Sequence, residues 1–381
     1  MKYPLFKVHT NTDILMPRLK EVFESGFINE GREVTEFREM LKNYWDTKNV
    51  TMTSSCTASL MMALKIAGVD HNSEVIAPSM TCVATNVSTE WLGAKTVWAD
   101  IDVDTGNIDP NDVAEKITDK TRAVICVNWA GVPCDLEKLQ KICKQNNIKL
   151  IQDAAHSFGS TYKNKDVCHW ADITCYSFQA IKHITSGDGG AIVCLSDKDH
   201  EYACRLKWYG FDRDRLKDED GNWKGRRWDS NILDVGWKLN MNNISAVIGI
   251  TNLEEADKIV GTHKKNAKIY SELFVQNDDI TPLKAEEYMD PAYWIYTVML
   301  DDAINRDIVI EKMKEADIHT GVVHVPNHPY DCFENKAFLP KTDKFAKNQI
   351  CIPCGWWLSS EDIKYIADTL TRVCNELRYI A

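Results

Sequence analysis

Residues 176–190 of the chain read YSFQAIKHITSGDGG, a segment with one lysine and a glycine-rich end. The apolar runs at 173–178 and 190–195 predict two strands, and the residues that join them have the composition of a turn instead of a helix. A lysine that follows a buried strand is expected to be buried itself, which disfavours its charged form and lowers its pKa. Because an amine nucleophile needs a lowered pKa, Lys182 is the first candidate catalytic residue. For this lysine taken alone, a surface position beside a loop is the alternative.

Strand-like and helix-like segments alternate upstream of this lysine. Short runs rich in β-branched residues lie at 49–55, 74–78, 95–100, 122–128 and 149–153. Amphipathic segments of helix length lie between several of them, at 57–67, 111–117 and 136–145. One more helix is predicted around residues 34–44, where apolar side chains recur at helical spacing. Such alternation predicts an α/β fold with a mostly parallel sheet that helices cover on both faces.

The pattern changes in the last third of the chain. A tryptophan-rich and charged segment at 205–237 precedes a helix predicted at 242–260. Beyond it, a strand is predicted at 293–300 and helices at 306–316 and 361–377. We therefore predict a large domain over residues 1–261 and a smaller α+β domain over residues 262–381.

A carboxylate stands at the end of a predicted strand, where Leu150 to Asp153 give way to Ala-Ala-His. A carboxylate at the end of a buried strand is costly unless a cation or a hydrogen-bond donor meets it. The protonated ring nitrogen of pyridoxal phosphate is such a cation, and the ring must be charged to act as an electron sink. An aspartate that caps the next helix is the alternative for Asp153.

A possible phosphate site lies further upstream, where Thr53-Ser54-Ser55-Cys56-Thr57-Ala58 joins a strand to a helix. Small hydroxyl residues at a helix start leave backbone N–H groups free to bind phosphate at the positive end of the helix dipole. The same residues are equally common as plain N-caps, so this signal is weak on its own.

The order of these three features resembles that of a known family. A phosphate turn, an aspartate at a strand end and a Ser-x-x-x-x-Lys before a Gly-Asp-Gly-Gly turn resemble the DegT-like sugar aminotransferases, which are fold-type I pyridoxal phosphate enzymes. The likeness also includes 25–28, 74–78, 100–102, 236–241 and 246–249. It implies an aspartate-aminotransferase-like large domain and a transaminase that converts a keto sugar, expected to be nucleotide-linked, to an amino sugar with glutamate as the expected donor. Amino-sugar synthesis for polysaccharide or lipopolysaccharide is the implied setting.

The resemblance assigns roles to the matched positions. Lys182 would bond to the cofactor and then move a proton between it and the substrate carbon, and Asp153 would pair with the pyridine nitrogen. The phosphate would be held by Cys56 and Thr57, with Ser177 as a further donor. Since the dehydratase branch of the family carries histidine in place of the lysine, the retained Lys182 favours transamination.

Lys238 matches a position that, in this family, reaches the cofactor phosphate from the neighbouring subunit. Many members have asparagine there, but a lysine ammonium is also a suitable phosphate partner. The resemblance therefore implies a homodimer with shared active sites.

Two positions depart from the family pattern. Cys56 stands where the phosphate turn usually has glycine, which suggests that this turn does not need a positive φ. Cys82 stands where an aromatic residue often covers the cofactor ring, so His156 is a candidate to lie against the ring in its place. A packing role for His156 is the alternative.

Candidate substrate contacts lie nearer the C-terminus. His324 and His328 belong to a segment that resembles the one that approaches the sugar in this family, although a structural loop is the alternative. Arg226 and Arg227, in the tryptophan-rich segment, are candidates for binding a nucleotide diphosphate or for a dimer interface. The competing functions are transamination of a cyclitol or another small ketone, a regulatory protein that keeps the fold without turnover, and a metal hydrolase.

The composition of the chain bears on its binding partners, its cell compartment and its metal content. The 381 residues carry a net charge of −11, from 45 Lys and Arg against 56 Asp and Glu, which argues against a nucleic-acid partner. No apolar run approaches the ~20 residues that a membrane-spanning helix needs, and residues 1–13 lack a signal-peptide pattern, so we expect a cytoplasmic protein. The thirteen cysteines are irregularly spaced and mostly in apolar stretches, as is typical of core thiols. Cys351 and Cys354 have metal-like spacing without further ligands at matching spacing, so no metal is expected.

Overall fold

The computed structural model describes residues 2–211, 224, 231–334 and 336–378. Its centre is a seven-stranded sheet in the order β1-β9-β8-β5-β4-β2-β3, in which only β9 runs antiparallel to its neighbours. The seven strands are β1 (Val50–Thr53), β2 (Glu74–Pro78), β3 (Lys95–Ala99), β4 (Thr121–Val127), β5 (Lys149–Asp153), β8 (Ile173–Ser177) and β9 (Gly190–Cys194). Each coincides with a strand predicted from the sequence, and the predicted mostly parallel sheet is confirmed.

Both faces of the sheet are buried because successive side chains of a strand point to opposite sides. In β4, Ala123 and Ile125 belong to the core beneath α3 (Cys56–Ile66) and α7 (Asp197–Leu206). Val124 and Cys126 belong to the core on the other face. That second core is covered by α2 (Arg32–Tyr44), α5 (Pro110–Lys116), α6 (Leu136–Gln145) and α8 (Asn243–Leu253).

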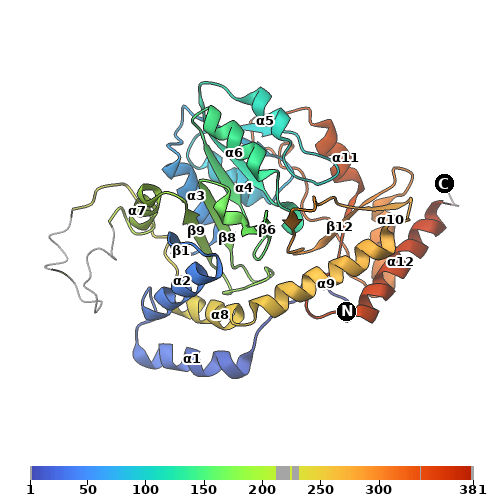
Figure 1. Ribbon diagram of the computed structural model, residues 1–381, viewed down its shortest axis with the longest axis horizontal. Coiled ribbons are helices and arrows are strands. Elements are labelled where there is room, and N and C mark those ends of the chain that lie inside the picture. Colours follow the sequence, from blue (N-terminus) through green and yellow to red (C-terminus); the bar gives the residue numbers. More distant parts are fainter. Residues whose placement is uncertain (1, 212–223, 225–230, 335, 379–381) are drawn as a thin grey trace.

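The apolar face predicted around residues 34–44 is the buried face of α2. Val34, Phe37 and Leu41 are buried there, and α2 packs along α8. α1 (Thr12–Ser25) lies on the other side of α8, at the bottom of the view in Figure 1. Between β2 and β3 the chain forms α4 (Val83–Glu90).

The C-terminal part of the chain builds a second core around a small antiparallel sheet. Its strands are β10 (Ile280–Pro282), β12 (Tyr296–Leu300) and β13 (Gln349–Ile352), and α9 (Ala256–Phe274), α10 (Arg306–Glu315) and α12 (Ser360–Arg378) share their apolar core. Further elements are α11 (Pro340–Asn348) and a three-stranded sheet of β11 (Met289–Asp290), β6 (Thr161–Tyr162) and β7 (Lys165–Asp166). The chain also forms two short 3-10 helices, η1 (Trp129–Gly131) and η2 (Val167–His169).

The single helix predicted at 242–260 is wrong in its extent. The structure has two helices there, α8 and α9, with a break at Glu254 and Glu255. No glycine or proline lies at this break, and apolar residues continue across it. The sequence pattern therefore does not indicate that one helix ends and another begins here.

The long helix α9 joins the two cores, as Figure 1 shows. Ile259 and Val260, near its start, belong to the core of the large sheet, whereas Ala267 and Tyr270 belong to the core of the small one. The predicted boundary between residues 261 and 262 therefore falls inside a continuous helix, at the point where its contacts pass from one core to the other. The division into two domains stays a prediction.

All thirteen cysteines are free thiols, and all but Cys82 and Cys332 are buried. Cys351 lies 3.4 Å from the Thr297 hydroxyl, and the Cys354 thiol donates to the His263 carbonyl, so both are packed within the protein. Among the described residues, no cluster of three metal-ligating side chains is present. Within the same residues, no helix combines the length and apolar character needed to cross a membrane. Arg226 and Arg227 lie outside the described residues.

Candidate active site

A cavity of about 280 Å³ opens where the parallel strands of the large sheet end. Segments that follow β1, β2, β5 and β8 all contribute to it, as expected for a ligand site in an open α/β sheet. The residues that line it are Ser55, Cys56, Thr57, Leu60, Thr81, Cys82, Ala84, Val127, Asp153, Ala155, His156, Ser177, Gln179, Ile181, Lys182, Asp188, Trp294 and His324. The fold thus gathers seven of the nine predicted site residues around one space.

Lys182 lies in the turn between β8 and β9, half-buried at the cavity wall. Its Nζ is 3.5 Å from the ring centroid of Trp294 and has no hydrogen bond or ion pair within the described residues. Burial lowers the pKa of the Lys182 amine to about 8, although the nearby Asp153 carboxylate opposes this shift. A substantial neutral fraction of the amine is therefore present near physiological pH, as a nucleophile requires.

Asp153 is buried at the end of β5 and faces the same cavity. Its Oδ2 accepts a hydrogen bond from the Thr85 hydroxyl at 2.8 Å, and its Oδ1 accepts one from the Ala155 N–H at 3.0 Å. Burial raises the pKa of this carboxyl, an effect that the Thr85 hydrogen bond opposes most strongly. A cationic group in the cavity would complete the stabilisation of the carboxylate.

The phosphate turn is the N-terminus of α3. Ser55 is the N-cap, and its side chain accepts a hydrogen bond from the Ala58 N–H. The N–H groups of Cys56 and Thr57 precede the first intrahelical hydrogen bonds and are available to an anion. Cys56 is the first residue of α3 and is not among the residues with positive φ, which confirms that this turn does not need glycine.

Gly190, at the end of the lysine segment, must be glycine for a steric reason that involves this turn. A Cβ at Gly190 would lie 2.5 Å from the Ser55 carbonyl carbon and 2.6 Å from the Cys56 nitrogen. The backbone of β9 therefore passes directly beneath the start of α3, and only a residue without a side chain allows that approach. The Lys182 segment and the phosphate turn are in this way built against each other.

Aromatic rings form one wall of the cavity. The His156 ring stacks on Trp294 with centroids 4.1 Å apart and faces His324 at 5.6 Å. Burial lowers the pKa of both histidines, that of His324 to about 4, so both rings are neutral at physiological pH. His156 Nδ1 and His324 Nε2 are buried and have no hydrogen-bond partner in the described part of the chain.

Two predicted residues do not line this cavity. His328 is buried outside it, with Nδ1 2.8 Å from the Ser79 hydroxyl, so its predicted substrate contact gains no support from the geometry. Lys238 donates a hydrogen bond to Asn240 Oδ1 at 2.5 Å, and its Nζ lies 4.4 Å from the centroid of the Trp208 ring. Its predicted role belongs to a neighbouring subunit and stays a prediction.

Sequence reasoning missed several residues of the site. Trp294 reaches Lys182 from a segment more than one hundred residues away, and its apolar surroundings indicate only a strand. Thr85 lies inside α4, where a buried threonine carries no special pattern. Gln179 and Asp188 lie in the same segment as Lys182. Their closeness to it in the sequence could have identified them as residues of the site.

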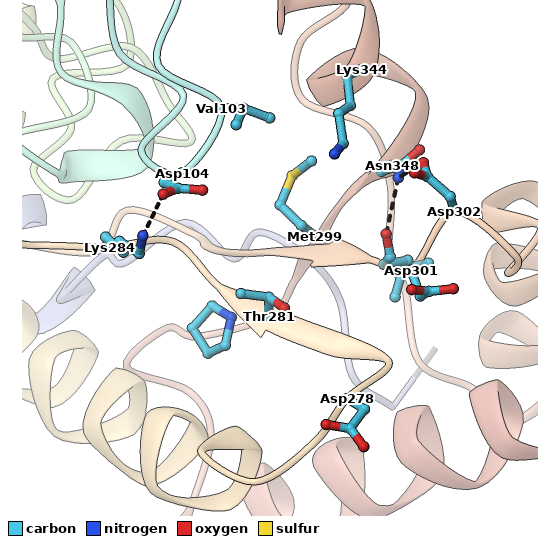
Figure 2. Close-up of a pocket in the computed structure, with 12 residues that line it drawn as sticks. Val103, Asp104, Asp278, Thr281, Lys284, Met299, Asp301, Asp302, Lys344 and Asn348 are labelled. Carbon is cyan, nitrogen blue, oxygen red and sulfur yellow. Dashed lines mark hydrogen bonds and ion pairs between the residues drawn. The ribbon is translucent and has the colours of Figure 1, made fainter.

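Figure 2 shows a second cavity, between the Val103–Asp104 loop and the small sheet. One of its two lysines, Lys284, is exposed and donates to the Asp104 carboxylate, which raises the pKa of the amine. Asn348 donates to Asp302 Oδ1 at 2.6 Å on the opposite side. Lys344, the other lysine that lines this cavity, is also exposed, so the cavity has no buried amine among its lining residues.

The polar groups of the first cavity match those that pyridoxal phosphate requires. Two unpartnered buried imidazole nitrogens point to a polar ligand, the α3 N-terminus suits a phosphate, Asp153 suits a cationic ring nitrogen, and Lys182 suits an aldehyde. The α/β fold and this set of groups define the class of pyridoxal phosphate-dependent aminotransferases.

Comparison with known proteins identifies the family. The sequence model described as the DegT/DnrJ/EryC1/StrS aminotransferase family matches residues 10–371, so the chain belongs to this family of sugar aminotransferases, and its cofactor is pyridoxal phosphate. GDP-perosamine synthase of Escherichia coli O157:H7 is 28% identical over 362 residues, which cover 92% of this chain and 93% of the relative.

Solved structures agree over nearly the whole chain. The sugar aminotransferase CalS13 of Micromonospora echinospora has a TM-score of 0.91 at 27% identity and covers 98% of this chain and 100% of its own. The PLP form of Spr1654 from Streptococcus pneumoniae has a TM-score of 0.90 at 26% identity, with 99% and 100% covered. The predicted fold class is thereby confirmed.

Proposed function

We propose that the protein transfers the amino group of glutamate to the ketone of a nucleotide-linked deoxy sugar and so produces an amino sugar. The observation that carries the proposal is the Lys182 amine, which has a lowered pKa and no ion pair within the described residues, in one cavity with the buried Asp153. The similarity to GDP-perosamine synthase, an enzyme named for a nucleotide-linked amino sugar, supports this substrate class.

Three parts of the chain would hold the cofactor. The N–H groups of Cys56 and Thr57, with the Ser177 hydroxyl nearby, would hold its phosphate, and Asp153 its ring nitrogen. Lys182 would hold its aldehyde carbon. When bound, pyridoxal phosphate supplies an aldehyde that takes up the amino group and a ring that acts as an electron sink.

Asp153 would keep a proton on the ring nitrogen because a buried carboxylate is stabilised by a neighbouring cation. Its hydrogen bonds from the Thr85 hydroxyl, the Ala155 N–H and the Cys56 thiol hold the carboxylate in one orientation at the cavity wall. Lys182 Nζ, with a pKa of about 8, both accepts and donates a proton near neutral pH and would transfer it at the substrate carbon.

The two neutral imidazoles would meet uncharged parts of the ligands. A neutral histidine donates from one ring nitrogen and accepts at the other, so it can bind a hydroxyl group without adding positive charge next to Lys182. His156, the more deeply buried of the two, would lie against the cofactor ring, and His324, from the C-terminal part, would lie nearer the substrate. We assign the sugar hydroxyl contact to His324.

The active unit is proposed to be a homodimer in which Lys238 reaches the phosphate of the neighbouring subunit. The segments around Lys238 expose large apolar side chains, with Phe27 79% and Val235 88% exposed. Exposed apolar side chains near Lys238 support a surface that a second copy of the chain covers.

A substrate panel tests the function. Purified protein is loaded with pyridoxal phosphate and mixed with glutamate and UDP-, GDP- or dTDP-linked keto sugars, and the amino-sugar product is identified by mass spectrometry. We expect amination of one nucleotide-linked ketone, and the product also gives the position of the new amine. Turnover of free cyclitol ketones alone would support the small-ketone alternative, and a lysine-bound chromophore without any turnover would support a regulatory protein.

A further inference from the structure

The contact between Lys182 and Trp294 connects the two halves of the molecule at the reacting amine. Trp294 precedes β12 in the C-terminal part and is almost fully buried, whereas Lys182 belongs to the turn after β8. With Nζ 3.5 Å from the ring centroid, the amine lies on the face of the indole, where the negative side of the ring quadrupole attracts a cation.

Trp294 is held firmly in this position. Its indole Nε1–H donates to the Ile181 carbonyl at 2.7 Å, one residue before the lysine that the ring receives. Its backbone N–H donates to the Ala130 carbonyl at 2.9 Å, and its ring stacks on Phe6 at 4.8 Å between centroids. The indole is therefore fixed to the same backbone that carries Lys182.

A second set of bonds joins the Lys182 turn to the residues before Trp294. The His183 ring donates from Nε2 to the Ala292 carbonyl at 3.0 Å, and the Ala292 N–H donates to the Ser160 hydroxyl at 3.0 Å. His183 directly follows Lys182 in the chain, just as Ile181 directly precedes it. The lysine is thus bracketed by two hydrogen bonds to the segment 292–294, and lysine and indole keep their relative position.

We infer that Trp294 is a positioning residue whose ring face receives the Lys182 amine whenever that amine is not joined to the cofactor. Amino transfer requires the amine to leave the cofactor and to return. A carboxylate partner would raise the pKa of the amine and hold its proton, whereas a ring face attracts the ammonium without accepting a conventional hydrogen bond. The indole keeps the free amine beside the reacting carbon and leaves its proton available.

The contact between the Lys182 amine and the Trp294 ring can be measured through the pH at which the amine loses its proton and becomes reactive, because the ring stabilises the protonated form. The titratable groups that face its amine are Asp153 on β5, Cys56 on α3, Cys82 before α4, and the neutral His156, His183 and His324. A substitution at residue 294 leaves all of these side chains in place, and of them His156, whose ring stacks on Trp294, loses a direct contact. Full-length protein freed of cofactor is labelled with trace formaldehyde and cyanoborohydride from about pH 6 to about pH 11, and methylation of the Lys182 peptide is followed by mass spectrometry.

We expect Trp294→Leu, which keeps an apolar wall without a ring face, to lower the labelling midpoint of Lys182 by about one pH unit. Trp294→Phe, which restores a weaker ring face, should recover part of that shift. The matched control is Trp170→Leu, because the Trp170 indole also donates to a backbone carbonyl and lies 6.0 Å from a lysine amine, that of Lys163. A midpoint for Trp294→Leu that stays at the wild-type value or rises, in folded protein, overturns the inference.

Fluorination tests the same contact without a change of shape. Global replacement of tryptophan by 5-fluorotryptophan withdraws charge from the ring face, so the wild-type midpoint should fall by a few tenths of a unit. The Trp294→Phe protein should show no such change, and an equal response in both proteins, or in neither, contradicts the role of this indole. Neither series uses a nucleotide sugar, so its outcome is separate from that of the substrate panel.

Discussion

Two lysines, Lys182 and Lys284, each stand beside a cavity that also contains aspartate, and they differ in almost every property that matters for chemistry. Lys284 is exposed, donates to Asp104 and has a raised pKa. Lys182 is half-buried against an indole, and burial lowers its pKa to about 8. The difference shows that neither the residue type nor a nearby aspartate makes an amine reactive. The fold does so when it removes the amine from most of the solvent and gives it no carboxylate as a hydrogen-bond partner.

The two cavities also differ in how the chain builds them. The Lys182 cavity collects the ends of parallel strands, so groups far apart in the sequence converge on it. The Lys284 cavity lies between one loop and a small antiparallel sheet and contains paired surface charges (Figure 2). Substitutions matched between the cavities therefore separate catalytic from ordinary effects.

The largest difference is expected from removing each lysine. Lys182→Ala should lower the rate of glutamate-dependent amination by at least about a thousandfold and abolish the lysine-bound chromophore, because the variant has lost both the nucleophile and the proton carrier. Lys284→Ala should retain wild-type turnover. Absorbance spectra and steady-state rates measure both effects, and full turnover by Lys182→Ala would contradict the assigned site.

The next difference is expected at the two sets of carboxylates. Asp153→Asn keeps the shape of the side chain but removes the charge that stabilises a ring cation, and kcat should fall by about a hundredfold. Asp301→Asn, in the second cavity, should leave kcat unchanged. Wild-type kcat in Asp153→Asn would show that the ring nitrogen is stabilised by another group.

A smaller effect is expected from the glycine beneath the phosphate turn. A Cβ at Gly190 would meet the Ser55 and Cys56 backbone, so Gly190→Ala should weaken pyridoxal phosphate binding by about thirtyfold as the start of α3 is displaced. The control is Gly261→Ala in α9, where the added Cβ has no neighbour within 4 Å among the described residues apart from its own helix, and helix propensity predicts a slight gain in melting temperature. Binding titration and thermal denaturation distinguish the two variants.

The smallest effect is a pH dependence. Because the lowered pKa of Lys182 makes its amine neutral above about pH 8, cofactor binding to the apoprotein should speed up by about tenfold from pH 7 to pH 9 and then level off. An ordinary lysine would show this rise near its usual pKa of about 10.4. Stopped-flow absorbance gives the midpoint, and a midpoint near the usual value would show that Lys182 is solvated.

Much of this arrangement follows from short-range sequence signals. The strands were predictable because each is a brief apolar run bounded by turn residues, and Asp153 and Ser177 each stand at the end of such a run. The start of a helix directly after a strand drew attention to Cys56 and Thr57, but the same pattern fits a plain N-cap, and their phosphate role came from the family resemblance. Parallel strands bring such ends together without any further information.

The rest depends on tertiary contacts that leave no local pattern. His324 and His328 are four residues apart in one loop, and only the fold decides that the first faces the cavity while the second binds Ser79. Trp294 approaches from the C-terminal part, and its apolar surroundings are those of any buried strand. The break between α8 and α9 has no glycine or proline, and Leu253 and Ala256 on either side of it pack into the same core, so no local pattern marks it.

The sharing of α9 between the two cores bears on how the molecule denatures. Its first turns are anchored by Ile259 and Val260 in one core and its later turns by Ala267 and Tyr270 in the other. Melting either core would leave half of a continuous helix without its apolar support, so the loss of one destabilises the other. We therefore expect a single cooperative calorimetric transition, with the amide protons at the middle of α9 among the slowest to exchange with solvent.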